Sequence, residues 1–539
     1  MEFISLDRNY INIEWKGTDD SPTIDPVISK LISGDIIEND ILSKPSRLRK
    51  EVLQGILVLS GKSYGRYKNK LLYKCIPNNK GLPSFLIPYD TKIGFSKKRE
   101  DKLISFKFER WIEKHPGGLL LETIGEVSDI NSYAEYLLRC KNVTQSIKPF
   151  TTEITTTIQR IKQTDDEIID NIRQKYNLCD RTSLSVISID PSGCKDIDDA
   201  VGVLHNGSTT ILSIYIANVP LIIDYLELWE HIGLRMSTIY LPDRNRPMLP
   251  PKLSTDLGSL LAGKRRIAMA LDLVIKDNVI IDTTYTPCIV SLEKNYAYEE
   301  HLLLNNSMYI IIKSLVSSLN LKYPHVDDIV DSHEVVQWLM ICMNKNSATV
   351  LAESNKGVFR TLKMNSPPSG TYKIPKEINS IIRTWDSTGS KYTLDTECGH
   401  DMMGGQLYTQ VTSPIRRIID FMNMSYLNGI HGINLPMGYI TILSTKLDYI
   451  NEQLKSIKKI QNDITLLQLM GVCNGPYKGF IIGHDSETYT IYFPDIQVIS
   501  TLQSKENLIL YSEHMFTFHA FNDEHTLRRK VRIHLKLNV

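Results

Sequence analysis

The hydrophobic and polar positions of this chain change their spacing twice. Between residues 50 and 130, apolar runs separated by turn residues predict the strands of a small barrel, namely 55–59, 71–75, 84–88, 103–108 and 119–123. From 299 to 470 helical spacing dominates, and an apolar stripe from Leu443 to Ile464 predicts a long amphipathic helix packed on a core. Short strands return at 479–483 and 489–493. The pattern therefore predicts an α+β protein.

The length of 539 residues suits about three or four domains. Residues 1–49 hold a few predicted strands, too short to make a barrel alone. We expect an OB-like barrel over 50–150, a larger region of strands and helices over 151–470, and a second small barrel over 471–539.

Charge is balanced, with 62 Lys and Arg against 61 Asp and Glu, so only local clusters can indicate a nucleic-acid partner. In the first predicted barrel, Lys62, Arg66 and Lys70 alternate with Tyr64 and Tyr67. Basic residues with interleaved aromatic rings suit a groove for single-stranded nucleic acid. A solvated barrel edge protected by lysines explains the same residues equally well.

The eight cysteines are scattered without a C-x-x-C pair, which predicts reduced thiols in an intracellular and most simply cytoplasmic protein. The acidic, polar start at Met1 does not match a secretory leader. No apolar stretch approaches the roughly 18 residues of a membrane span. We therefore expect no membrane partner.

Four aspartates crowd one turn after a predicted strand at 184–189: Asp190, Asp196, Asp198 and Asp199. Like charges this close resist ionisation, whereas Mg²⁺ prefers oxygen ligands and neutralises them. Two metal ions, or one ion and a separate catalytic acid, both suit phosphodiester hydrolysis. A solvated acidic turn explains these residues alone equally well, and the spacing of an EF-hand calcium loop is missing.

A second candidate is the segment 412–417, which is followed by Asp420. Its Ser-Pro step predicts the first turn of a helix capped by that serine or by the threonine before it. A helix N-terminus beside Arg416 and Arg417 would bind a phosphate. The alternative is an ordinary capped helix with Arg417 paired to Asp420, which is favoured when the acidic cluster is left aside.

Taken in this order, these segments resemble the ribonuclease II/R family, the RNB exoribonucleases, including the exosome-type members. The likeness lies in residues 189–200, where every acidic position is retained, in 240–260, which begins Tyr-Leu-Pro-Asp, and in 408–420. Residues 85–129 are also similar to the second cold-shock barrel of exosome-type members. The resemblance implies small OB/cold-shock β-barrels flanking a large mixed α/β RNB catalytic domain at 151–470. It makes 1–49 a shortened first cold-shock-like barrel and 471–539 an OB-like RNA-binding barrel.

The same resemblance implies a metal-dependent site. Asp190, Asp196 and Asp199 would hold one or two Mg²⁺ ions, which Mn²⁺ would be able to replace. Asp198 would orient or activate the attacking water, or complete the metal site.

For the substrate, the resemblance implies that Arg416 binds the scissile phosphate and stabilises its transition state, with Arg417 beside it. Tyr240 would stack on a base near the 3′ end. The implied reaction is processive hydrolysis of single-stranded RNA from the 3′ end, releasing nucleoside 5′-monophosphates.

Three departures from the family pattern bear on activity: Asn218, Gln337 and Gln410. They leave the acidic positions untouched, so we expect an active 3′→5′ exoribonuclease with altered efficiency or end preference. The alternative is a catalytically weakened relative that acts as an RNA- or partner-binding module, and a nuclease for DNA or small nucleotides is a third interpretation. Because no cysteine- and acid-rich endonuclease domain precedes the barrels, we expect no stable tethering to an exosome. We also expect a monomer.

Overall fold

A computed structural model describes residues 1–17, 24–90, 99–143, 145–233, 235–363, 378, 390–472, 476–485, 487–523 and 527–536. The chain forms two compact units. The first comprises 1–144, 241–244 and 456–539, and the second comprises 145–240 and 245–455. Strands and helices are mixed along the chain, and the predicted α+β class is confirmed.

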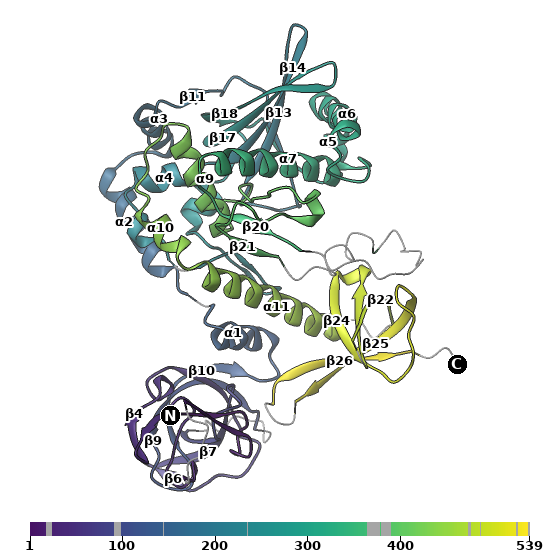
Figure 1. The fold of residues 1–539 in the computed structure, drawn as a ribbon. Coiled ribbons are helices and arrows are strands. Elements are labelled where there is room, and N and C mark those ends of the chain that lie inside the picture. Colours follow the sequence, from purple (N-terminus) through teal and green to yellow (C-terminus); the bar gives the residue numbers. More distant parts are fainter. Residues whose placement is uncertain are drawn as a thin grey trace. The chain divides into compact units, whose positions relative to one another are not determined.

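The second unit is built on a seven-stranded sheet of order β11-β18-β17-β14-β13-β12-β19 (Figure 1). The strands are β11 (Cys179–Asp180), β12 (Ile187–Asp190), β13 (Asp199–Asn206), β14 (Thr209–Ala217), β17 (Arg265–Lys276), β18 (Val279–Ser291) and β19 (Lys294–Ala297). Most neighbours are antiparallel, whereas β11 runs parallel to β18 and β19 runs parallel to β12. The parallel pairing places the start of the chain beyond β19 next to Asp190.

The sheet is buried on both faces, and β14 shows why. Its run Ile214–Ala217 is continuously apolar, as expected for a strand covered on both sides. Ile214 and Ile216 enter one core, whereas Tyr215 and Ala217 enter the other. Each face therefore has its own layer of helices.

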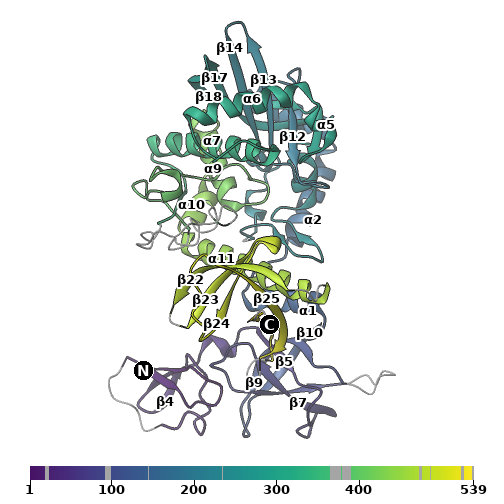
Figure 2. The same cartoon turned by 90° about the vertical axis from the view of Figure 1, so that its right-hand side faces the viewer.

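One face carries helices α2 (Lys148–Ile161), α3 (Asp165–Tyr176) and α4 (Val219–Tyr225). The other carries α5 (His301–Leu304), α6 (Ser307–Lys322) and α7 (Ser332–Glu353). Figure 1 shows α3 and α6 on opposite sides of the strands, and Figure 2 shows α6 and α7 from a second direction. Helices α9 (Ile418–Ile430) and α10 (Gly438–Ser444) complete the first of these cores.

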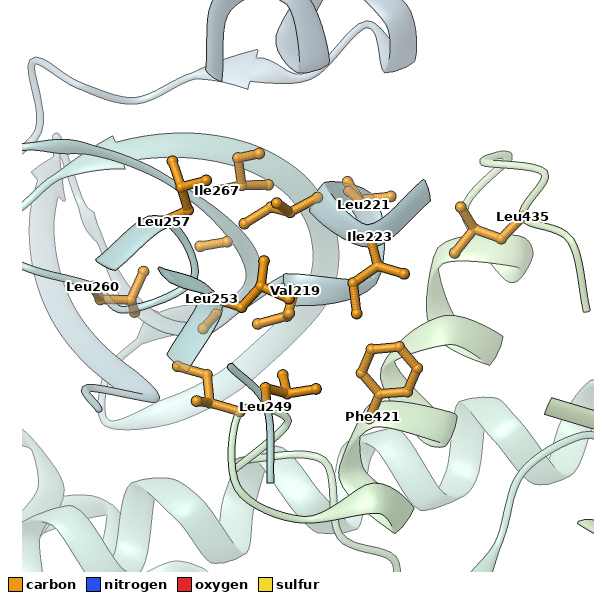
Figure 3. Close-up of a cluster of buried hydrophobic side chains, with 14 of the residues drawn as sticks. Val219, Leu221, Ile223, Leu249, Leu253, Leu257, Leu260, Ile267, Phe421 and Leu435 are labelled. Carbon is orange, nitrogen blue, oxygen red and sulfur yellow. The ribbon is translucent and has the colours of Figure 1, made fainter. Parts of the chain in front are cut away.

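The segment between β16 (Asn245–Arg246) and β17 packs its leucines under the sheet. Leu249, Leu253 and Leu257 are buried against α4 and against Phe421 of α9, as Figure 3 shows. The short π-helical turn Leu253–Leu257 lies within this segment. Strand β16 pairs with β15 (Ile239–Tyr240), so this packing also fixes the position of Tyr240 at the end of β15.

The first unit holds three smaller sheets. Strands β1 (Glu2–Ser5), β2 (Ile13–Lys16), β3 (Ile36–Glu38) and β4 (Ile41–Lys44) form a four-stranded sheet. A six-stranded sheet, closed by an additional β5–β7 pairing, contains β5 (Leu53–Leu57), β6 (Arg66–Tyr67), β7 (Lys70–Pro77), β8 (Phe85–Tyr89), β9 (Lys102–Arg110) and β10 (Gly117–Glu126). The last, seen in Figure 2, contains β22 (Tyr477–Asp485), β23 (Thr488–Phe493), β24 (Val498–Gln503), β25 (Glu513–Asn522) and β26 (Arg529–Leu535). Helix α1 (Ile130–Cys140) follows β10.

The apolar stripe predicted as one long helix is divided between two helices. Leu443 lies at the end of α10, and α11 (Leu447–Val472) begins only after a turn at 445–446. Leu443, Leu447 and Ile450 enter the same core in spite of this turn. The spacing of buried residues therefore continues across a break in the backbone helix.

Two further expectations concern the thiols and the membrane. The seven cysteines within the described residues are free thiols, whereas Cys473 lies outside them. Among the helices that the structure describes, none combines the length and the apolar character that a bilayer crossing requires.

Candidate active site

The four aspartates lie on the loop that joins β12 to β13. Asp190 ends β12 and Asp199 begins β13, and because these strands are antiparallel neighbours the two residues share one end of the sheet. The loop is fixed by Ser259, whose hydroxyl donates to the Lys195 carbonyl at 2.8 Å and accepts from the Ile197 amide at 2.9 Å. Neutral hydrogen bonds therefore hold the loop against the repulsion of its own charges.

Asp198 points inward and is 1 % exposed. One carboxylate oxygen accepts from the Ile415 amide at 3.0 Å, and the other accepts from Nε of Arg416 at 2.8 Å. Burial raises the pKa of Asp198 to about 7, although Arg416 opposes this rise by stabilising the charge. This ion pair joins two segments that are 218 residues apart in the sequence.

The pKa values of Asp190 and Asp199 are both raised by burial, and the charge of Arg416 opposes this rise only in part. One oxygen of Asp190 is buried and accepts no hydrogen bond, and burial raises the pKa of this residue to about 6. The pKa of Asp199 is raised well above its ordinary value, first by burial and then by the charge of Asp190. Asp196 is half-buried and accepts a hydrogen bond from the Tyr240 hydroxyl at 3.3 Å.

The helix predicted to begin at Ser413–Pro414 forms only one turn there. The Arg416 and Arg417 amides donate to the Ser413 carbonyl at 3.2 and 3.0 Å, but Arg417 is then extended, so helix α9 begins only at Ile418. The Thr238 amide donates to the Arg416 carbonyl at 2.9 Å, and the Ile418 amide donates to the Met236 carbonyl at 3.0 Å. This bridging ends the turn at Arg417 and holds Arg416 where its side chain reaches the acidic loop.

Six of the seven predicted site residues line one cavity of about 910 Å³: Asp190, Asp196, Asp198, Asp199, Tyr240 and Arg416. Arg417 does not line it. Its guanidinium instead donates to Asp420 at 2.8 Å and to the Ser413 hydroxyl at 3.0 Å, which is the pairing with Asp420 that the alternative interpretation expected. Asp420 is fully buried and also accepts from the Ser413 amide, so Arg417 braces the turn that carries its neighbour.

The RNB domain family matches residues 179–307, which contain the acidic loop and most of the sheet. The chain contains an RNB domain.

Among curated proteins, the chain is 32% identical over 181 residues to DIS3-like exonuclease 2 of Schizosaccharomyces pombe, covering 32% of this chain and 18% of that protein. It is 30% identical over 200 residues to ribonuclease R of Ureaplasma parvum, covering 36% and 27%. These matches therefore span less than a third of either relative.

Solved structures match over a longer stretch. Mycoplasma genitalium RNase R in complex with ribose methylated single-stranded RNA superposes with a TM-score of 0.64 at 16% identity, covering 93% of this chain and 95% of that one. Yeast Ssd1, described as a pseudonuclease, superposes with a TM-score of 0.58 at 14% identity, covering 90% and 70%. At such identities the likeness shows a shared fold.

The departures lie in different surroundings within the RNB fold. Asn218 is buried and exchanges two 2.8 Å hydrogen bonds with Asn428 of α9, so its amide serves the core. Gln337 is exposed on α7. Gln410 is buried, and in its better-satisfied orientation the amide oxygen accepts from Arg417 at 3.0 Å. Gln410 therefore supports Arg417 beside the site, Asn218 supports the core, and none of the three lines the cavity.

Tyr298 is a cavity residue that the sequence interpretation missed. It follows β19, and its amide donates to the Asp190 carbonyl at 3.1 Å. Only the parallel pairing of β19 with β12 brings it there, and a tyrosine in a polar segment carries no local signal of that pairing.

The donor set fits a divalent cation bound with few protein ligands. Within the described ranges, no three His, Cys, Asp or Glu side chains converge as a complete metal centre. Mg²⁺, however, commonly takes one or two carboxylates and completes its shell with water and substrate phosphate. Asp190 and Asp199 offer two buried, mutually repelling carboxylates, one with an unpartnered oxygen, and a cation beside them would reverse the rise in both pKa values.

Proposed function

We propose that this chain degrades single-stranded RNA hydrolytically from the 3′ end, releasing nucleoside 5′-monophosphates in a Mg²⁺-dependent reaction. The observation that carries the proposal is the convergence of four aspartates and one arginine on a single cavity in an RNB domain. Relatives named as exonucleases and ribonuclease R support the same class of reaction.

Arg416 is suited to bind the scissile phosphate. Its Nε is held by Asp198, while the side chain remains 42% exposed and lines the cavity. The terminal guanidinium nitrogens can therefore donate to a phosphate and stabilise the negative charge that grows on it during hydrolysis. Because both Asp198 oxygens already accept hydrogen bonds, we propose that Asp198 acts mainly by orienting Arg416.

Asp190 and Asp199 would hold Mg²⁺, with Asp196 at the edge of the same site, and the ion would supply Lewis-acid activation of phosphate and water. Tyr240 is 39% exposed, and its hydroxyl is fixed on Asp196. Its ring can therefore stack on a base without losing this anchor.

The test is a single-turnover assay on a 3′-extended RNA and on its DNA analogue, with Mg²⁺ or with EDTA. Wild type is compared with Asp198→Asn and with Asp180→Asn, which alters an exposed aspartate outside the cavity. We expect Mg²⁺-dependent shortening of RNA to mononucleotides by wild type and by Asp180→Asn, and its loss in Asp198→Asn. Cleavage that survives in EDTA or in Asp198→Asn would refute the proposed site.

A second candidate function is RNA binding without cleavage. The observations that favour it are the likeness to a pseudonuclease and the lack, among the described residues, of a three-ligand metal centre. The same assay separates the two, because a binding protein would retain the RNA in a filter assay and leave it intact with Mg²⁺ or Mn²⁺.

A further inference from the structure

The wall of the cavity contains a second tyrosine besides Tyr240, namely Tyr298, whose backbone is fixed to the acidic strand. Ala297 is in register with Asp190 between the parallel strands β19 and β12, and the Tyr298 amide donates to the Asp190 carbonyl at 3.1 Å. Tyr298 lines the same cavity as the four aspartates. The backbone hydrogen bond places Cα, but it leaves the rotation of the ring open.

The ring of Tyr298 is covered by His333, the second residue of α7. Their ring centroids are 3.9 Å apart and the ring planes differ by 10°, so the two rings are stacked face to face. His333 is exposed on its other side. The imidazole therefore occupies the space into which the tyrosine ring would otherwise turn.

The neighbouring residues clamp the same two segments together. Glu299 accepts from the Ser332 amide at 2.7 Å and from the Ser332 hydroxyl at 2.5 Å, and the Glu299 amide donates back to that hydroxyl at 3.2 Å. Glu299 has a φ of +55°, a left-handed conformation that costs a non-glycine residue roughly 1 kcal/mol and needs such support. The start of α7 is itself fixed by a capping box between Asp331 and Glu334.

Attachment of α7 to the sheet explains the hydrogen bonds between Glu299 and Ser332, but it does not explain the stacking of His333 on Tyr298. Ser332 and Glu299 suffice to attach α7 to the sheet, and an imidazole at a helix N-terminus gains nothing from the helix dipole. The packing partner of His333 is the one ring in this loop that faces the cavity.

We infer that His333 is a positioning residue, which holds the Tyr298 ring against the reacting end of the substrate. This inference rests on the proposed function. Removing the imidazole is expected to raise KM for short RNA about two- to tenfold, the range expected when one aromatic pair contact is lost, with kcat changed less than twofold. His333→Phe keeps a flat ring and is expected to restore KM.

The kinetic experiment is a double-mutant cycle of His333→Ala and Tyr298→Ala, with His333→Phe for rescue. His205→Ala is the matched control, because His205 is an exposed histidine on β13 outside the cavity. We expect no further effect of His333→Ala once Tyr298 is alanine, and no effect of His205→Ala. An equal effect of His333→Ala in both backgrounds, or an unchanged KM in the single variant, would overturn the inference.

A second measurement is independent of activity. With 3-fluorotyrosine at position 298, the ¹⁹F resonance is expected to move when His333 becomes alanine and to return towards its original position with phenylalanine, because a stacked ring shields the fluorine. A ¹⁹F resonance that keeps its position when His333 is replaced would overturn the inference, whatever the kinetics. A protein that cleaves no RNA but shows the shift would refute the proposed function and still support the placement of the ring.

Discussion

Replacing Asp190 by asparagine is expected to stabilise the metal-free protein while abolishing cleavage. The folded protein raises the pKa of Asp190 from 3.8 to about 6, chiefly through burial. Above pH 6 Asp190 is ionised in both the folded and the unfolded state. The cost of burying this charge then lowers the free energy of unfolding by at most about 3 kcal/mol. Below pH 3.8 both states are protonated and the penalty vanishes. Metal-free wild type should therefore gain stability as the pH falls from about 6 towards 4.

Asparagine keeps the shape of the side chain and removes the free-energy cost of the buried charge. It also removes the repulsion of Asp199 by the Asp190 charge, which helps to raise the pKa of Asp199. We expect urea unfolding at pH 7.5 in EDTA to show a gain of about 1–3 kcal/mol for Asp190→Asn. Mg²⁺ should stabilise wild type by binding its folded state, and should stabilise the variant less.

Asp180→Asn is the control for this experiment. Asp180 is exposed, and hydrogen bonds from Thr182 lower its pKa, so its replacement removes no penalty and should give no gain. A loss of stability in Asp190→Asn in EDTA, or equal stabilisation of both proteins by Mg²⁺, would refute the reasoning.

Three other perturbations probe the surroundings of the site. Asp198→Asn should lower the free energy of unfolding in urea by about 1–3 kcal/mol. The amide has one oxygen to accept from Ile415 and Arg416, so one of these donors would face the amide N–H group. An unchanged unfolding midpoint would contradict this prediction. His400 is buried with both ring nitrogens unpartnered and its pKa lowered to about 4, so the unfolded state binds the proton more readily. Stability should fall by up to about 3 kcal/mol as the pH drops from 6.5 to 4, and His400→Phe should flatten this acid limb in a pH series of melts. Tyr240→Ala should weaken RNA binding by about 1–3 kcal/mol in fluorescence anisotropy and Tyr240→Phe by less, whereas equal losses would assign the effect to the hydroxyl.

The chemistry of the acidic loop could be predicted from sequence because its residues are contiguous: Asp190 to Asp199 lie on one turn whatever the tertiary structure. Strand β14 (Thr209–Ala217) is likewise encoded locally, since the apolar run Ile214–Ala217 is the usual sign of a strand buried on both faces. These features depend on local sequence alone.

The features that could not be predicted depend on pairings between segments that are distant in the sequence. The Ser-Pro step at 413–414 has the local chemistry of a helix start and forms one turn, yet bridging to residues 236–238 interrupts the helix at Arg417, and α9 begins only at Ile418. Tyr298 reaches the cavity only through the pairing of β19 with β12. Asn218 pairs with Asn428, 210 positions away. None of these pairings leaves a periodic signal in the chain.

The ion pair between Asp198 and Arg416 has a consequence for the growing polypeptide. Ribosomal synthesis delivers the acidic loop long before the arginine that completes the site, and the two are joined only after the intervening sheet and helices have formed. A nascent chain thus emerges beside messenger and ribosomal RNA with the proposed cleavage site unassembled. For the same reason, the proposed nuclease activity should recover later than the spectroscopic signal of the helices when the protein refolds from denaturant. Activity would therefore show when folding of the domain is complete.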